Sequence, residues 1–196
     1  ADENFNTFSL SWYNNTDVDP ATGLTPYINM QKVLKVCHDF VDNFDNTFSN
    51  LLFIGQTGVG KTFLSNCIAR ALMDSCHSII YLTAGEFFDS FKSDDFKEFG
   101  SSKFDTSFFV ECDLLIIDDL GTEKASDYNF SNLFNTINER LLRRKSIIIS
   151  SNLEMPDIET RYSQRIFSRL VSAYSILRLF GDDIRCMKKL SPTKRS

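Results

Sequence analysis

Short apolar runs alternate with helical patterns along most of this chain. Continuous apolar runs are typical of strands that are buried on both faces of a parallel sheet. Five such runs are present, the last weaker than the others, at residues 51–54, 79–82, 114–117, 147–149 and 176–180. Because strands that alternate with helices connect by right-handed crossovers, the pattern predicts an α/β fold: a parallel five-stranded sheet sandwiched by helices.

Apolar residues recur at helical spacing in residues 26–44, 62–74 and 127–145. The first helix has a clear start, with Thr25 as N-cap and Pro26 at the first helical position. Residues 1–24 instead mix Asn, Asp and Thr with isolated aromatics, which is typical of an irregular arm docked on a folded body. We therefore predict an arm at 1–24, one α/β domain at 25–187 and a basic tail at 188–196.

A glycine-rich segment, GQTGVGKT at 55–62, lies between the first predicted strand and a helix. It matches G-x-x-x-x-G-K-[ST], in which glycines let backbone N–H groups surround a phosphate at a helix N-terminus. Lys61 would reach the β- and γ-phosphates of ATP, and the Thr62 hydroxyl would hold Mg²⁺. The alternative is a glycine-rich turn without a ligand, but the flanking strand and helix favour nucleotide binding. The predicted nucleotide-binding residues are Gly55, Gln56, Thr57, Gly58, Val59, Gly60, Lys61, Thr62 and Phe63.

Two later strands end in polar side chains, at the carboxyl edge where parallel sheets bind ligands. DLLIIDDLG at 113–121 supplies Asp118, which would hold Mg²⁺ through water, and Asp119 for the attacking water, where many such ATPases use the longer glutamate. The alternative is that these acids cap the next helix. Asn152, at the end of IIISSN, would orient that water or sense the γ-phosphate, unless it is only a turn residue. A further strand, 79–82, precedes the acidic motif, unlike small GTPase-like arrangements, in which the two motif strands are neighbours.

Arginines follow the last helical crossover at four-residue spacing. In RYSQRIFSRLV, Arg161, Arg165 and Arg169 would form one stripe on a helix. Such a stripe is usually solvated, but a neighbouring subunit's ATP site commonly receives a guanidinium of this kind. We favour that role for Arg169 and leave both alternatives open for Arg165. Arg185, in GDDIR, could reach the phosphates of its own subunit.

Charge and composition exclude several classes of protein. With 21 basic and 26 acidic side chains the net charge is −5, which argues against a bulk electrostatic grip on nucleic acid. No apolar run approaches the roughly 20 residues that span a membrane, and no signal peptide stands at the start. Five cysteines without a C-x-x-C pair and two scattered histidines indicate reduced thiols in a cytoplasmic protein and no zinc site. Because the chain starts with Ala1, an excised domain is one interpretation.

Taken together, these motifs resemble the AAA+ ATPase domain of the bacterial replicative helicase-loader family, the DnaC/DnaI-like proteins, and their IstB-like relatives. The resemblance runs from about Asn4 to Arg185, with the blocks in the family's order. They are NLLFIGQTGVGKTFLSNCIA, IIYLTAGEFFDSF, CDLLIIDDLGTE, IIISSNL and QRIFSRLV.

This resemblance implies a P-loop NTPase of the AAA+ class and a role for each motif residue. Walker A is matched by Lys61 and Thr62, Walker B by Asp118 and Asp119, sensor 1 by Asn152, the arginine finger by Arg169 and sensor 2 by Arg185. It further implies ATP and Mg²⁺ as cofactors, slow hydrolysis stimulated by assembly or DNA, and a homo-oligomer in the ATP-bound state. The implied role is that of a helicase loader and primosome component in DNA replication.

Two alternatives stay open beside the loader. One is an IstB-like helper in transposition or phage replication, with the same ATPase and a different client. The other is an ATP-gated binding switch with little turnover. Family members bind the replicative helicase through a separate N-terminal module, and nothing in this sequence corresponds to that module.

Single-stranded DNA is a further partner that the resemblance implies, through the insertion that residues 86–112 match. Lysines and phenylalanines interleave there and could form a stacking platform. The alternative is ordinary helix packing, and five acidic residues weaken the DNA interpretation. The candidates are Lys92, Lys97, Lys103, Phe87, Phe88, Phe91, Phe96, Phe99 and Phe104, and elsewhere Arg143, Arg144, Lys145, Lys188, Lys189, Lys194 and Arg195.

Overall fold

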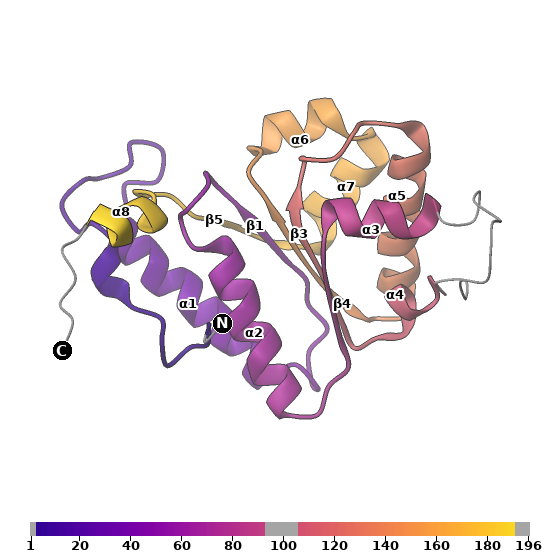
Figure 1. Cartoon of the computed structure of the whole chain (residues 1–196), viewed down its shortest axis with the longest axis horizontal. Helices are drawn as coiled ribbons and strands as arrows, with labels where there is room; N and C mark the ends of the chain where they lie inside the picture. The colour runs from indigo at the N-terminus through magenta and orange to yellow at the C-terminus, as the bar shows by residue number, and fades with distance from the viewer. Residues whose placement is uncertain (1–2, 93–105, 191–196) are drawn as a thin grey trace.

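A single parallel sheet organises the protein in this computed structural model, which describes residues 3–92 and 106–190 (Figure 1). Its five strands lie in the order β2-β3-β4-β1-β5. Each predicted apolar run forms one of them, so the α/β prediction is confirmed. The strands are β1 (Leu51–Ile54), β2 (Ile79–Thr83), β3 (Leu114–Leu120), β4 (Ser146–Ser151) and β5 (Ser175–Arg178).

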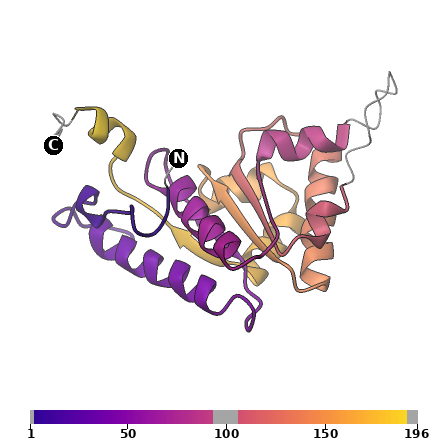
Figure 2. The same cartoon turned by 60° about the horizontal axis from the view of Figure 1, so that its bottom comes forward.

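Helices cover both faces of the sheet, as the two views in Figures 1 and 2 show. One side carries the arm with its short 3₁₀ helix η1 (Leu10–Trp12), α1 (Pro26–Asp42), α2 (Lys61–Asp74) and α8 (Ile184–Leu190). The other side carries α3 (Ala84–Lys92), α4 (Phe108–Glu111), α5 (Asp127–Leu142), α6 (Met155–Arg161) and α7 (Gln164–Ala173).

Burial on both faces explains the continuous apolar runs of β1, β3 and β4, whereas the edge strands β2 and β5 are partly exposed, contrary to the prediction. In β3, Leu114 and Ile116 pack toward α1 and α2, whereas Leu115 and Ile117 pack toward the helices of the opposite face. All four are fully buried, and burial of each such side chain stabilises the fold by about 1.5–3 kcal/mol.

The predicted start of the first helix is confirmed. The Thr25 hydroxyl accepts the backbone N–H of Ile28 at 3.3 Å, and Pro26 occupies the first turn. Helix α5 ends at Leu142 and is shorter than the predicted 127–145, because Arg143 caps it and Arg144 adopts a positive φ of 54°.

The predicted arginine stripe is wrong in one member. The chain breaks between α6 and α7, because Ser163 accepts the backbone N–H of Ile166 at 3.4 Å and so caps a new helix. Arg161 therefore ends α6 and pairs with Glu123, with 3.5 Å between Nε and Oε1. Arg165 and Arg169 share α7.

A buried guanidinium fastens α5 to the sheet. Arg140 is fully buried, and within the described part of the chain its hydrogen bonds go to one thiol and to four backbone carbonyls. The shortest of these joins Nη2 to the carbonyl of Ser146 at 2.6 Å, at the start of β4. Burial lowers the pKa of Arg140. The other carbonyl partners belong to Phe109, Cys112 and Asp113.

Part of the predicted DNA platform lies outside the described residues, namely Lys97, Lys103, Phe96, Phe99 and Phe104. Within the described part, Phe87 and Phe88 are buried in the core beneath α3, so ordinary helix packing accounts for them. Lys92 pairs with Asp89 at 2.8 Å.

Lys188 and Lys189, expected at the start of a basic tail, belong to α8, while Lys194 and Arg195 lie outside the described residues. The division of the chain at residues 24 and 187 stays a prediction. No helix in 3–92 or 106–190 has the length and hydropathy to cross a membrane.

The loops at the amino edge of the sheet contain a pair that titrates. His77 Nε2 lies 2.9 Å from Asp45 Oδ1, and this hydrogen bond raises the pKa of His77 against the opposing effect of burial. Since the folded-state pKa is above the ordinary 6.5, the pair stabilises the fold fully below about pH 6.5, and the effect is lost as pH rises through the raised value.

We therefore expect the melting temperature of the wild type to exceed that of His77→Gln by more at about pH 5.5 than at about pH 9, where the histidine is neutral. The difference should stay within about 1 kcal/mol, as for other exposed pairs. In an Asp45→Asn background the effect of His77→Gln should depend less on pH, because only the Leu72 carbonyl and the charge of Asp113 then still raise the pKa of His77. A pH-independent difference in the wild-type background would contradict the assignment.

Candidate nucleotide-binding site

The glycine-rich loop runs from the end of β1 to the start of α2 and is shaped by three positive φ angles. They are 144° at Gly55, 84° at Gly58 and 107° at Gly60, which is also the N-cap of α2. A Cβ on Gly58 would lie 2.1 Å from Asp183 Oδ1, and one on Gly60 would lie 2.5 Å from the Tyr13 hydroxyl. Glycine is thus required both by backbone conformation and by close approach, as expected of a phosphate cradle.

Lys61 is the buried cation of the site. Its Nζ donates to the carbonyls of Gly55 and Gln56 at 2.6 and 2.8 Å, and to Asn152 Oδ1 at 2.6 Å. Burial lowers the pKa of Lys61, and the charges of Asp119 and Asp118 oppose that decrease. The structure therefore joins the Walker A lysine directly to the predicted sensor asparagine, 91 residues later in the sequence.

Asp118 lies behind Thr62 and receives four hydrogen bonds. Oδ2 accepts the Thr62 hydroxyl at 3.0 Å and the Tyr81 hydroxyl at 2.9 Å. Oδ1 accepts the Ser150 hydroxyl and, at 3.2 Å, the backbone N–H of Asp119. The predicted metal residues Thr62 and Asp118 are thus brought together. Tyr81 and Ser150 were not predicted at the site, although both lie in sequence blocks named above, because nothing local indicates that either side chain reaches Asp118.

Asp119 interrupts the regular geometry of β3. Its φ is 57°, and the β3–β4 register shifts between Ile117 and Leu120. Its N–H donates to Ser150 Oγ at 3.0 Å, and its Oδ1 accepts Asn152 Nδ2 at 3.4 Å. The break in strand alternation lets Asp119 face the same cavity as Lys61 and Asn152 although Asp118 precedes it directly.

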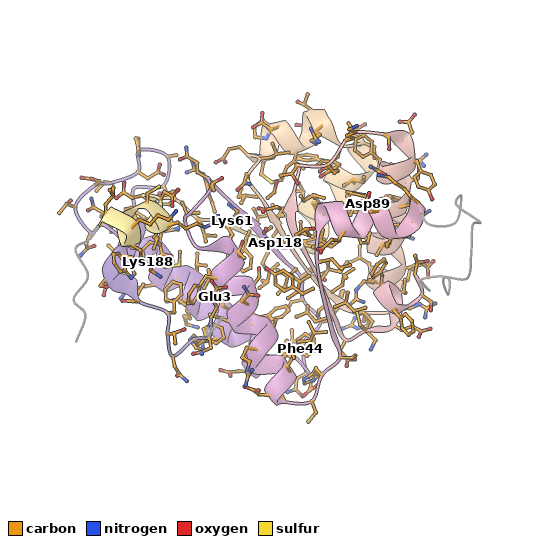
Figure 3. All side chains as sticks on the ribbon, in the orientation of Figure 1. Glu3, Phe44, Lys61, Asp89, Asp118 and Lys188 are labelled. Atoms are coloured by element: carbon orange, nitrogen blue, oxygen red, sulfur yellow. The ribbon has the colours of Figure 1, made fainter. Side chains whose placement is uncertain are left out.

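A cavity of about 280 Å³ opens above the loop. Figure 3 shows Lys61 and Asp118 at one end of the sheet, Lys188 on α8 and Glu3 beside α2. Lys188 Nζ lies 5.7 Å from the centre of the Trp12 ring and 5.8 Å from that of Phe63. The predicted residues on the cavity wall are Thr57, Gly58, Gly60, Lys61, Thr62, Phe63, Asp119, Asn152 and Arg185.

Residues of the arm form much of the remaining wall, and the sequence did not indicate this. Phe8, Trp12 and Tyr13 contribute rings, and Glu3, Thr7 and Ser9 contribute polar groups. The Tyr13 hydroxyl donates to the carbonyl of Val59, in the loop, at 3.1 Å. The isolated aromatics between 5 and 13 were the available signal, but they indicated only docking.

Gly55, Gln56, Val59 and Asp118 belong to the loop or lie behind it and do not line the cavity, and Arg169 lies apart from the whole site. It lines a separate groove between α5 and α7 with Phe134, Gln164, Arg165 and Ser168, and its Nη2 donates to Asn138 Oδ1 at 3.2 Å. A finger that acts on a neighbouring subunit must be absent from its own site, but the role of Arg169 stays a prediction.

The residues present fit a magnesium nucleotide. A glycine cradle that any Cβ would fill, a buried lysine and a hydroxyl–carboxylate pair converge within one loop and two strand ends. Hydroxyl and carboxylate oxygens are the donors that Mg²⁺ prefers, and backbone N–H groups at a helix start suit phosphates.

Comparison with known families agrees with this chemistry. A family model described as IstB-like ATP binding protein matches residues 28–191. The chain belongs to this family. It is therefore a protein of an ATP-binding family, in agreement with the glycine-rich motif.

Individual relatives are more distant. The chain is 23% identical over 151 residues to the replicative helicase loader DnaC of Escherichia coli K12, covering 76% of this chain and 61% of DnaC. It is 32% identical over 111 residues to the phage-like element PBSX protein XkdC of Bacillus subtilis, covering 54% of this chain and 40% of XkdC. The chain thus spans about three fifths of DnaC and less of XkdC.

The fold is also that of a solved replication initiator. The structure of DnaA bound to AMPPCP and single-stranded DNA matches with a TM-score of 0.65 at 19% identity, covering 85% of this chain and 53% of DnaA.

The contact between Gly58 and Asp183 generates a test. We expect Gly58→Ala to destabilise the fold by about 1–2 kcal/mol for the left-handed backbone, and by about 1 kcal/mol more because Asp183 is displaced from capping α8. Gly23→Ala is the matched control: φ there is 68° and nothing lies within 4 Å of the added Cβ. Urea unfolding measures both. Equal losses would show that Asp183 moves without cost.

Proposed function

We propose that this chain binds ATP with Mg²⁺ and hydrolyses it slowly as part of a larger assembly, in the manner of a helicase loader. The observation that carries the proposal is that Lys61, Thr62, Asp119 and Asn152 come from three strand ends to one cavity, with Asp118 hydrogen-bonded behind Thr62. Membership of an ATP-binding family supports the choice of nucleotide.

Each residue has a distinct task in this proposal. The loop N–H groups and Lys61 bind the β- and γ-phosphates, and Lys61 gives up its contact with Asn152 to do so. Thr62 and Asp118 would hold Mg²⁺, which neutralises phosphate charge when bound. Asp119 and the released Asn152 orient the attacking water, and Arg185, on the cavity wall, contacts the phosphates of its own subunit.

The aromatic rings on the cavity wall suit the adenine base of ATP. Phe8, Trp12 and Phe63 offer ring faces, and ring stacking is a general way to hold a purine. In this proposal the arm therefore completes the nucleotide site.

Assembly supplies the remaining guanidinium. Arg169, exposed in the groove between α5 and α7, would contact the γ-phosphate in a neighbouring copy, so that turnover requires a homo-oligomer. Arg165 lines the same groove and is the alternative finger.

The protein on which this ATPase acts, its client, is proposed from the relatives and not from the geometry of the site. The relative DnaC, a replicative helicase loader, supports a replicative helicase as client, and the DnaA complex supports single-stranded DNA as a partner. The IstB-like family and XkdC support a transposition or phage helper instead, and a third possibility is an ATP-gated switch with little turnover. Co-purification with a replicative helicase, rather than with a transposase or a phage protein, distinguishes the first two. We place the protein in the cytoplasm.

Lys61→Ala should weaken ATP binding by about 100-fold or more, because it removes the charged donor to the phosphates. Trp12 is the single tryptophan and lines the cavity, so its fluorescence reports binding directly. Lys35→Ala is the control, since Lys35 is exposed on α1 and pairs only with Asp39 at 2.7 Å among the described residues. Tight binding by Lys61→Ala would refute the nucleotide site.

Arg169→Ala should bind ATP within about twofold of the wild type but lose turnover by about 10³-fold, since a finger acts on the transition state. The assay is phosphate release at protein concentrations that allow assembly. Arg70→Ala, a surface arginine paired with Asp74, is the control. Unchanged turnover in Arg169→Ala would exclude this residue, and Arg165→Ala then tests the alternative. A wild type that binds ATP and assembles on DNA without turnover would favour the switch.

A further inference from the structure

The four hydrogen bonds on Asp118 come from four elements. Thr62 donates from α2, and Ser150 and the N–H of Asp119 donate from the β4–β3 side. Tyr81 donates from β2, the edge strand, at 2.9 Å. It binds the same oxygen, Oδ2, as the Thr62 hydroxyl.

The register of the sheet explains how a tyrosine reaches this position. Thr83 lies opposite Asp118 in the β2–β3 pair, and Tyr81 lies opposite Ile116. Tyr81 faces the α2 side, where it packs with Ile79 and the cluster that contains Ile116. Its ring therefore runs diagonally along the sheet toward the carboxyl edge, and the length of the phenol brings its hydroxyl to Asp118.

A carboxylate that holds a metal through water must present its oxygens in one orientation. Without Tyr81, Oδ2 would keep only the Thr62 hydroxyl, which is itself expected at the metal. With Tyr81, both oxygens of Asp118 have a donor that does not belong to the loop, one from β2 and one from β4. Such outer partners orient the groups that contact a metal and commonly change its affinity by about 10–100-fold.

We propose that Tyr81 is a positioning residue, which fixes Asp118 for Mg²⁺ and so couples the edge strand β2 to the metal part of the nucleotide site. This inference rests on the proposed function. Tyr81 is not among the residues that line the cavity, and its described side-chain hydrogen bond goes to Asp118, so we expect its effect to pass through that carboxylate.

The test is Tyr81→Phe, which removes one hydroxyl and keeps the ring in its packing. Trp12 fluorescence measures ATP affinity in EDTA and across a Mg²⁺ titration. We expect the affinity in EDTA to stay within about twofold and the Mg²⁺ midpoint to rise about 10-fold. Tyr27→Phe is the matched control: its hydroxyl accepts only a long 3.4 Å bond from Gln31 on α1, among the described contacts. Urea unfolding of both variants confirms that they fold.

The outcomes separate the inference from the function on which it rests. A wild type whose ATP affinity depends on Mg²⁺, together with an unchanged midpoint in Tyr81→Phe, would overturn the role of Tyr81 alone. Equal loss of affinity in EDTA and in Mg²⁺ would also overturn it, because a general structural defect would explain both. A wild type that binds no ATP, or binds it without regard to Mg²⁺, would overturn the proposed metal site and this inference together.

Discussion

The site depends on one constraint, the placement of β4 between β1 and β3. Parallel strands end at the same edge, so the loop after β1, the carboxylates of β3 and the asparagine after β4 meet there. Phe53 lies opposite Ser150, and Ile116 lies opposite Ile148. Ser150 consequently reaches Asp118, and Asn152 stands between Lys61 and Asp119. If β1 lay directly beside β3, Asn152 at the end of β4 could not stand between Lys61 and Asp119.

The irregularity in β3 follows from the demand that two successive carboxylates serve one site. In a regular strand their side chains would point to opposite faces. The left-handed conformation of Asp119 breaks the alternation at a cost of about 1–3 kcal/mol, which the surrounding contacts must offset. Ser150 stabilises both aspartates in this arrangement, since its hydroxyl donates to Asp118 and accepts from the N–H of Asp119.

The sequence predicted the features whose causes are local. Glycines that need positive φ, a lysine and threonine at a helix start, and apolar runs buried on both faces each leave a pattern within about ten residues. Tyr81 and Ser150 could not be predicted, because their partner, Asp118, is 37 and 32 positions away and contact depends on register. The prediction of one arginine stripe was wrong for a local reason. The four-residue spacing of the arginines continues past Ser163, but the Ser163 hydroxyl caps a new helix there.

Both ends of the chain contribute to the phosphate loop, and this makes the loop a point of coupling. Tyr13 from the arm holds Val59 and crowds Gly60, while Asp183 before α8 crowds Gly58. Lys61 meanwhile donates to three neutral oxygens, whereas phosphate oxygens are charged acceptors and form stronger bonds. Exchange of these partners for phosphate oxygens would therefore be favourable and would free Asn152 toward Asp119. In the proposed function, a ligand at the loop would thereby alter contacts with the arm, with α8 and with the end of β4, which are the elements that must respond if ATP is to control assembly.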